Sequence, residues 1–452
     1  MATFDKKAPG VYVEEISKLP PSVASVATAI PGFVGYTEKG TKNTAIRVES
    51  LIDFEEKFGY ACKIAISDEE DKINGLEYKL HESMRLFYAN GGGICYVVSV
   101  GNYTDAISNT ALETGISMLE PIDEVTMIVV PDAVSLEIKD LASVQNAALA
   151  QCLELKDRVA ILDVKDTGNC NTDATNFRNS IGTKGASYGA AYYPYIKSVY
   201  DREINVYDIY KGLELSNQEL ENAQYYAELS EPTEESTLFA KQLMSKPEYA
   251  KLVAKIQEQA NLLPPSGAIA GIYCANDNQR GVWHAPANMS VSGISDINVR
   301  ISDKQQGELN EDTSGKCINA IRAFQGKGIL VWGARTLDGL SSEWKYISVR
   351  RFFNYVEESI QESTAWAVFQ PNDANTWVKV RCQIENFLSN LWRDGALAGS
   401  TPQEAFYVRV GINQTMTAQD ILNGYMIVEI GMAAVRPAEF IVLQFSHKLQ
   451  ES

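Results

Sequence analysis

The chain has 452 residues, 45% hydrophobic and 22% charged, which is typical of a globular protein and allows about three domains. Its 58 acidic and 40 basic residues give a net charge of −18. Proteins that bind nucleic acid or anionic membranes need a basic face, and this sequence has no Lys/Arg-rich block, so we exclude both classes.

The lengths of the apolar runs and the positions of the cysteines and histidines exclude further classes of protein. No stretch approaches the roughly 18 consecutive apolar residues of a membrane span, so we predict no membrane insertion. Residues 1–7 lack the apolar core of a signal peptide, and we expect the protein to stay in the cytoplasm of the cell that makes it. The seven cysteines form no CxxC pair and the three histidines are scattered, so we predict no disulfide framework, no metal and no cofactor.

Residues 1–25 are predicted to form an extended arm. Pro9 and Gly10 indicate a turn, residues 11–16 (VYVEEI) have strand-forming character, and Pro20-Pro21 prevents a helix. A single strand at a terminus cannot bury itself, so this one must pair with another strand.

Residues 26–120 are predicted to form a small α+β domain. A half-exposed strand at 46–50 and a strand at 94–98 flank an amphipathic helix at 76–89. The glycines at 91–93 follow the helix and precede the strand. Phosphate-binding loops have the opposite order, so these glycines predict a helix C-cap and a tight turn.

Residues 121–342 alternate strands and helices in the manner of a doubly wound α/β domain. Strands at 125–130 and 158–164 enclose a helix at 136–155, which predicts a parallel βαβ unit with a right-handed crossover. Further strands are expected at 186–193, 268–274 and 328–332. The charged, helix-patterned stretch at about 200–264 is predicted to be a surface insertion.

The last part of the chain is predicted to form a second α+β domain, residues 343–435, followed by a C-terminal arm, 436–452. The pattern predicts helices at 343–362 and 376–393 and strands at 405–410, 425–430 and, within the arm, 440–445. The fold class is therefore a multidomain α/β protein, with an α+β domain on each side of a doubly wound domain and an extended arm at each terminus.

A hydrolase is the rival interpretation, with Ser187 or His284 at its centre. Residues 185–189 (GASYG) match the GxSxG nucleophile motif, which needs a strand before the serine and a helix after it. Here a polar loop precedes the serine and a strand-like run follows, and no histidine has a convincing serine partner. Asp277 and Arg280 follow the strand expected at 268–274, where active sites often lie, but without a nucleophile nearby we interpret them as an ion pair or turn that fixes a loop.

Several segments resemble contractile phage tail sheath proteins. The resemblance follows the chain in order but does not cover the insertion at 200–264. It rests on these segments: 9–15 (PGVYVEE), 29–35 (AIPGFVG), 90–98 (NGGGICYVV), 265–288 (including RGVWHAPAN), 331–337 (VWGARTL) and 349–353 (VRRFF).

The resemblance implies a structural subunit and not an enzyme. It implies a subtilisin-like doubly wound domain without protease function, and six-fold rings stacked helically around an inner tube protein, with baseplate and tail terminator proteins as further partners. After cytoplasmic assembly, the subunit would be part of a virion or phage-tail-like particle.

Within that resemblance, the terminal arms of neighbouring subunits would add strands to the sheet of the C-terminal domain. The exchanged strands would include Val11, Tyr12 and Val13 at one end of the chain and Ile441, Val442 and Leu443 at the other. Strands 405–410 and 425–430 would receive them. Lys379 and Arg393, on the polar side of the helix at 376–393, either contact the tube or are only solvated.

Overall fold

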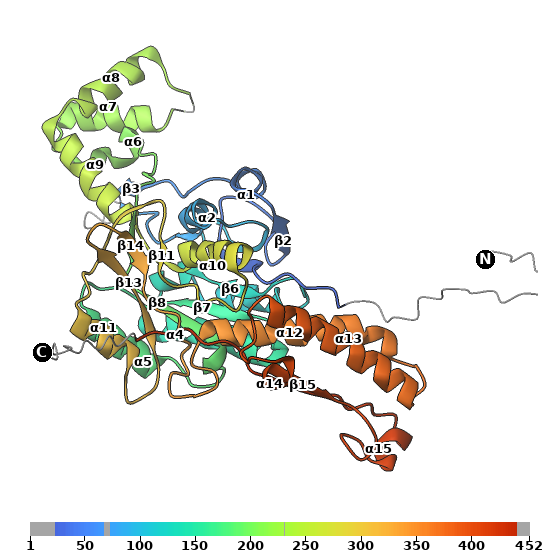
Figure 1. Ribbon diagram of the computed structural model, residues 1–452. Coiled ribbons are helices and arrows are strands. Elements are labelled where there is room, and N and C mark those ends of the chain that lie inside the picture. Colours follow the sequence, from blue (N-terminus) through green and yellow to red (C-terminus); the bar gives the residue numbers. More distant parts are fainter. Residues whose placement is uncertain (1–22, 67–72, 230, 441–452) are drawn as a thin grey trace, which may run out of the picture. The chain divides into compact units, whose positions relative to one another are not determined.

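The computed structural model describes residues 23–66, 73–229 and 231–440 (Figure 1). The predicted exchange strands at 11–13 and 441–443 lie outside the described residues. Tertiary contacts divide the described chain into two units. We call residues 26–358 with 434–440 the α/β unit, and residues 23–25 with 359–433 the C-terminal unit.

A nine-stranded sheet forms the centre of the α/β unit, in the order β11-β14-β13-β8-β7-β6-β1-β5-β2. Its six parallel strands are β1 (Pro31–Tyr36), β5 (Cys95–Gly101), β6 (Met127–Val129), β7 (Val159–Asp163), β8 (Gly189–Tyr193) and β13 (Ile318–Phe324). The antiparallel edge strands are β2 (Ala45–Val48), β14 (Gly328–Val331) and β11 (Met289–Ser290). Across the sheet the parallel strands lie in the order β13-β8-β7-β6-β1-β5, which is 6-5-4-3-1-2 when these six are numbered along the chain. The order reverses at β1, so the sheet is doubly wound.

The expected domain boundary at residue 120 is not present. Strand β1 pairs in parallel with β5 on one side and with β6 on the other, so residues 26–120 and the following βαβ units share one sheet. All six residues of β1 are buried, as is usual for a central strand of a parallel sheet. The prediction of a separate N-terminal domain was wrong because strand order is a long-range property.

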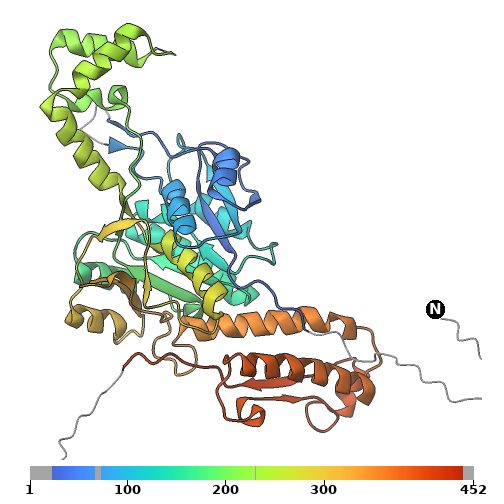
Figure 2. The same cartoon turned by 45° about the horizontal axis from the view of Figure 1, so that its top comes forward.

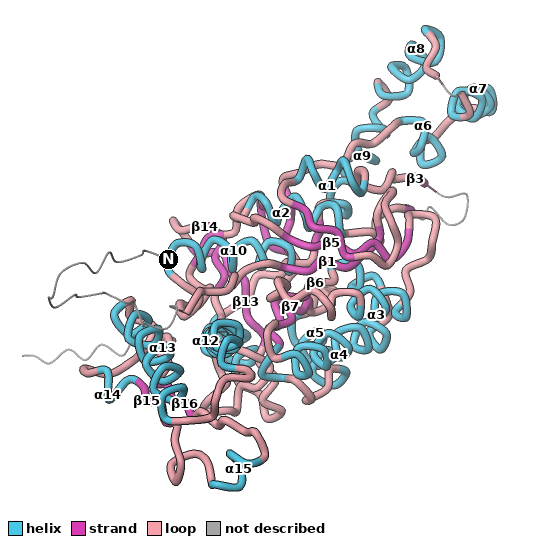
Figure 3. The backbone as a smooth tube through the Cα atoms, turned by 90° about the vertical axis from the view of Figure 1, so that its right-hand side faces the viewer, coloured by secondary structure: helices cyan, strands magenta, loops and turns pink. Residues whose placement is uncertain are grey.

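Helices cover both faces of the sheet (Figure 3). One face buries side chains from α3 (Asn109–Ser117), α4 (Ile138–Leu155) and α5 (Cys170–Ser180). The other face buries side chains from α1 (Leu51–Phe58), α2 (Leu80–Ala89) and α10 (Ser266–Arg280). Helix α11 (Asp303–Asn310) and the two-residue strands β3 (Ala65–Ile66) and β4 (Ile73–Asn74) complete this part of the chain.

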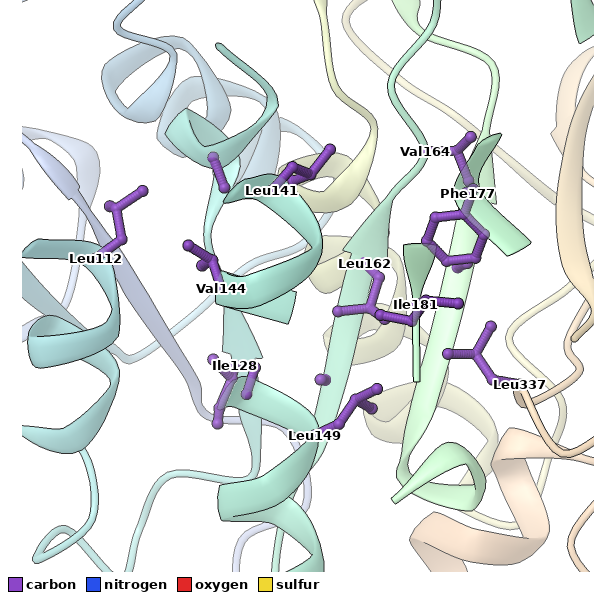
Figure 4. Packing of buried hydrophobic residues seen from close by; sticks show 14 of the residues in the cluster. Leu112, Ile128, Leu141, Val144, Leu149, Leu162, Val164, Phe177, Ile181 and Leu337 are labelled. Atoms are coloured by element: carbon purple, nitrogen blue, oxygen red, sulfur yellow. The ribbon is translucent and has the colours of Figure 1, made fainter. Parts of the chain in front are cut away.

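Side-chain alternation along the strands creates two separate cores. Phe33 packs in the α2/α10 core, whereas its neighbour Val34 packs in the α3/α4 core. Figure 4 shows the latter, where Leu112 and Val144 from two helices and Ile128 from β6 point into the same interior. The period of two residues that defines a strand therefore determines which layer each side chain joins.

The strand expected at 268–274 is a helix. These residues lie in α10, where Ser266 to Cys274 are all buried. A Cβ atom at Gly271 would collide with the carbonyl oxygen of Phe87 in α2, so glycine allows the two helices to pack closely. Because α10 packs against both α2 and the strands β6 and β7, residues 266–274 form a continuous buried run, and such a run cannot be distinguished from a buried strand by periodicity.

The segment at 200–264 contains four helices: α6 (Val206–Ile209), α7 (Asn217–Ala227), α8 (Glu234–Met244) and α9 (Pro247–Ala260). A small apolar core of its own includes Phe239 and Leu243. The chain leaves after β9 (Ile196–Ser198) and returns in β10 (Leu262–Leu263), and these strands pair antiparallel beside β12 (Ile294–Ile297). The segment therefore begins and ends at neighbouring points, as an insertion should.

The C-terminal unit is a helical hairpin with a two-stranded ribbon (Figure 2). Helix α12 (Ile347–Thr364) enters it and α13 (Ala374–Arg393) follows. The remaining elements are α14 (Pro402–Ala405), β15 (Phe406–Arg409), α15 (Ala418–Leu422) and β16 (Glu429–Met432). Across the described ranges, none of the helices has both the length and the apolar character needed to cross a membrane.

Candidate assembly sites

The carboxyl edge of the sheet, where doubly wound proteins usually bind ligands, is filled by the chain itself. The carboxylate of Asp132, just after β6, accepts hydrogen bonds from the backbone N–H groups of Lys79 (2.5 Å) and Leu80 (2.9 Å) at the start of α2. It also accepts one from Tyr36 N–H at the end of β1 (2.6 Å). A bound phosphate would use the same helix N-terminus, so the internal carboxylate occupies the place of a ligand.

A second carboxylate occupies the N-terminus of the other large helix on this face. Asp163, the last residue of β7, accepts a hydrogen bond from Ser266 N–H at the start of α10 (2.9 Å). Burial raises the pKa of Asp163 to about 7 and that of Asp132 to about 6. Sequence analysis did not single out either residue, although an aspartate at or just after a buried strand was an available signal.

The hydrolase interpretation finds no support in the geometry. Ser187 lies in a short 3₁₀ turn, Ala186–Tyr188, that precedes β8, so strand and turn are in the reverse of the required order. Among the described histidines, His284 is exposed, and His81 is buried with its Nε2 3.4 Å from the Glu55 carboxylate. Neither hydrogen-bonds Ser187, and within ranges 23–66, 73–229 and 231–440 no three potential metal ligands gather.

Asp277 has the structural role that the sequence favoured, but with a different partner. It lies within α10 and not after a strand. Its carboxylate accepts two hydrogen bonds from Arg351 in α12, at 3.0 and 2.6 Å, and both side chains are 3% exposed. Arg351 also donates to the Thr28 carbonyl (2.8 Å). This buried ion pair therefore holds the chain where residues 26–30 enter the α/β unit.

Among the residues that the structure describes, no third strand pairs with the ribbon of β15 and β16, so we call its two outer sides open edges. Its register pairs Phe406 with Met432, and Ala433 N–H donates to the Ala405 carbonyl (2.8 Å). Because hydrogen-bonded and non-bonded pairs alternate in an antiparallel ladder, this register directs the backbone groups of Phe406 and Val408 away from β16. A two-stranded ribbon with such edges can accept a further strand on either side. The expected strand at 425–430 begins later than predicted, at Glu429.

One face of the ribbon packs on α13 and the other is polar. Val408 is buried, whereas Tyr407 and Arg409 are exposed. Tyr407 donates to the Glu429 carboxylate (2.8 Å), and the Arg409 guanidinium lies 4.6 Å from the centre of the Tyr407 ring. A Cβ atom at residue 431 would collide with the Tyr407 ring, so a larger residue than Gly431 would require that exposed ring to shift.

Lys379 and Arg393 lie on one exposed stripe of α13. They are 14 residues apart, which places them within about 40° of each other around the helix axis. Asn386 and Asn390, also exposed, lie between them on the same stripe. The opposite side of α13 buries Val380, Ile384, Phe387, Leu388 and Leu391. The structure thus brings the two predicted contact residues onto one surface.

The chain matches two families that together cover most of its length. Residues 105–337 match the phage tail sheath protein central domain, and residues 341–448 match the phage tail sheath C-terminal domain. The tail sheath protein of Vibrio phage KVP40 is 23% identical over 193 residues, and that of Enterobacteria phage T4 is 25% identical over 126 residues. These matches cover 42% and 28% of this chain but only 27% and 19% of the two relatives.

Solved structures of contractile assemblies match nearly the whole chain, and two of them are sheaths in the contracted state. One is the PVC sheath complex of an extracellular contractile injection system in its contracted state, with 32% identity, a TM-score of 0.69 and 99% of both chains covered. The other is the helical sheath of the anti-feeding prophage (AFP) in its contracted state, with 30% identity, a TM-score of 0.65, and 97% of this chain and 99% of that one covered. With its central-domain match spanning more than half of the sequence, this chain belongs to the phage tail sheath family.

Proposed function

We propose that this chain is the structural subunit of a contractile sheath, which polymerises around an inner tube and shortens to drive the tube through a target envelope. The main support is the similarity, over 99% of both chains, to the sheath subunit of an extracellular contractile injection system. The ligand crevice filled by Asp132 and Asp163 supports a structural role and not an enzymatic one. The producing cell assembles the sheath in its cytoplasm, and the subunit then becomes part of a phage-tail-like particle.

The subunits would be joined by strand exchange. In this proposal, Val11, Tyr12 and Val13 of one copy and Ile441, Val442 and Leu443 of another pair with the two open edges of the β15–β16 ribbon. Each added strand would pair with backbone groups that point away from the other strand of the ribbon. Because donor and acceptor surfaces differ, the contact is heterologous and propagates into a helical assembly of stacked six-fold rings.

Contraction in this proposal moves the units of each subunit as rigid bodies while the arms keep the lattice connected. The energy that drives contraction comes from contacts between subunits that have not yet formed in the extended sheath, so no nucleotide is required. The doubly wound sheet, whose carboxyl edge is filled by Asp132 and Asp163, supports the finer comparison with a subtilisin-like domain that has no protease function. Baseplate and tail terminator proteins would limit the two ends of the assembly.

Electron microscopy of negatively stained protein, alone and mixed with its cognate tube protein, tests the proposal. We expect tubes or stacked rings of uniform width. A protein that stays monomeric at all concentrations, with and without the tube, would contradict it. Hydrolysis of an ester or peptide substrate that is lost in Ser187→Ala would instead favour the rival enzyme.

Neutralising the exposed stripe of α13 is expected to weaken tube binding. The double variant Lys379→Gln/Arg393→Gln removes two exposed positive charges that we propose contact acidic groups of the tube. We expect the affinity for the tube to fall about tenfold at low salt, and the difference to shrink above roughly 0.5 M salt because of screening. Arg381→Gln is the control, since that side chain lies on another side of α13 near Glu385. Equal losses in both variants would exclude a specific role for the stripe.

A further inference from the structure

Arg335 and Glu439 form a two-point clamp on the chain just before its C-terminal segment. Arg335 Nε lies 2.9 Å from Glu439 Oε1, and Nη2 lies 2.6 Å from Oε2. The hydroxyl of Tyr346 also donates to Glu439, at 3.1 Å. Such a paired contact between a planar guanidinium and a carboxylate fixes direction as well as distance.

Arg335 is itself held rigidly within the α/β unit. It is 1% exposed, and its Nη1 donates to the Asn310 carbonyl (2.9 Å). Its backbone N–H donates to the side chain of Asn319 in β13 (2.7 Å), which returns a hydrogen bond to the Arg335 carbonyl (2.8 Å). Burial lowers the pKa of Arg335, but hydrogen bonding and charge attraction from Glu439, together with Cys317, raise it above its usual value. Glu439 is therefore attached to the sheet and not to a mobile side chain.

The clamp shortens the free chain between the C-terminal unit and the proposed exchange strand. Ala433, the residue after β16, is fixed by the hydrogen bond from its N–H to the Ala405 carbonyl. If Glu439 were free, residues 434–439 would add about 20 Å of slack at roughly 3.3 Å per residue. Extra slack lowers the effective concentration of a tethered strand at its binding site. The position of the clamp thus determines how closely the proposed exchange strand, which includes residues 441–443, is confined near its binding site on the next copy.

The entry of the chain into the α/β unit carries a similar device. Arg351, buried beside Asp277, donates to the carbonyl of Thr28, just beyond the proposed N-terminal arm. Both points at which an arm meets the α/β unit are therefore held by a buried arginine. Because a buried arginine holds the backbone or a side chain at both places, we infer that the two ends of the α/β unit are fixed in direction as well as buried.

We infer that Arg335 is a positioning residue for strand exchange, which holds Glu439 so that residues 441–443 leave the α/β unit from a fixed point toward a second copy of this chain. The inference rests on the proposed function. Glu439 lies two residues before Ile441, and its side chain is one-fifth exposed, so its ion pair with Arg335 is partly shielded from solvent.

Glu439→Gln, with the full-length protein, tests the clamp through two measurements. Hydrogen–deuterium exchange of the monomer reports whether residues 434–440 are released from the α/β unit, and we expect their backbone amides to exchange at least tenfold faster. The midpoint of thermal unfolding of the α/β unit should change little. Sedimentation with the tube protein reports assembly, and we expect the critical concentration for polymerisation to rise at least tenfold. Glu308→Gln is the matched control, since its surface pair with Lys304 is 3.9 Å long and exposed.

A six-residue Gly-Ser insertion between Phe440 and Ile441, in the otherwise unchanged protein, separates positioning from stability. It adds slack without breaking the clamp, and we expect the same rise in critical concentration. Normal assembly of both variants, or of the insertion alone, would overturn the positioning role. If the unmodified protein itself forms no tubes, the proposed function fails. A separate outcome, an unchanged hydrogen–deuterium exchange rate at residues 434–440 in Glu439→Gln, would show that the clamp does not hold the chain.

Discussion

Deletion of residues 1–20 is expected to abolish assembly into tubes while the subunit stays folded. The deletion removes Val11, Tyr12 and Val13, the proposed exchange strand. Two hydrogen bonds that hold the chain lie beyond the deleted residues: Ala24 N–H donates to Ser363 Oγ (3.1 Å), and Arg351 donates to the Thr28 carbonyl (2.8 Å). We therefore expect the deletion to leave both of these contacts in place while it removes the proposed contacts between copies.

A variant of unchanged length separates strand pairing from simple loss of mass. In Val11→Pro/Val13→Pro, two backbone N–H donors disappear, and proline cannot join the interior of a sheet ladder. We expect tubes to be lost in this variant as in the deletion, as seen by electron microscopy. The control Val11→Ile/Val13→Ile keeps strand propensity and should assemble normally. Tubes of ordinary width from the deletion variant would refute exchange through the N-terminal arm.

The second large effect is expected from Asp132→Asn, which should lower the free energy of unfolding by about 3 kcal/mol. Asp132 accepts three backbone N–H bonds with two oxygens, one oxygen facing Tyr36 and the other facing Lys79 and Leu80. Asparagine has a single acceptor oxygen, so its NH₂ group must face at least one N–H donor. A buried donor is then left unpaired. Urea denaturation at pH 7.5 measures the loss.

Asp163→Asn is the matched control, and its effect should have the opposite sign. One acceptor oxygen is enough for the Ser266 N–H bond, and asparagine avoids the cost of ionising a buried group. Since burial raises the pKa of Asp163 to about 7, above the roughly 4 of an unfolded aspartate, the folded state binds the extra proton between about pH 4 and 7. The stability of the unmodified protein therefore falls as pH rises through that window.

We accordingly expect Asp163→Asn to be more stable than the unmodified protein by up to about 4 kcal/mol at pH 8 and by about 1 kcal/mol at pH 5, with the difference vanishing only below about pH 4. Denaturation curves at the two pH values measure it. A loss of stability at both values would mean that the Asp163 charge, held at the N-terminus of α10, is itself stabilising. The two variants thus test whether these carboxylates stabilise the fold through the number of hydrogen bonds they accept or through their charge.

The filled crevice also explains how a doubly wound sheet can serve a structural role. Ligand sites in this fold arise because helix N-termini at the carboxyl edge have free N–H groups. Here Asp132 and Asp163 occupy the starts of α2 and α10. The edge that would bind a ligand instead ties the two helices to the sheet.

Local pattern determined much of this protein from the sequence alone. Apolar residues at helical spacing located α4, α12 and α13 to within a few residues, and short apolar runs located β6, β7 and β8. The exposure of Lys379 and Arg393 on one stripe also followed from helical periodicity. These features depend on interactions between residues close in the chain, which a single sequence contains.

Tertiary structure alone decided the rest. The pairing of β1 with β6 joined two predicted domains, and residues 268–274 are helical and packed against both α2 and the sheet, although their apolar pattern suited a strand. The carboxylate of Asp132 meets α2 across some fifty residues, and Glu439 meets Arg335 across 104. Such contacts depend on the order of strands and on where the chain returns, and no local pattern specifies either, because each is set by the packing of distant elements against one another.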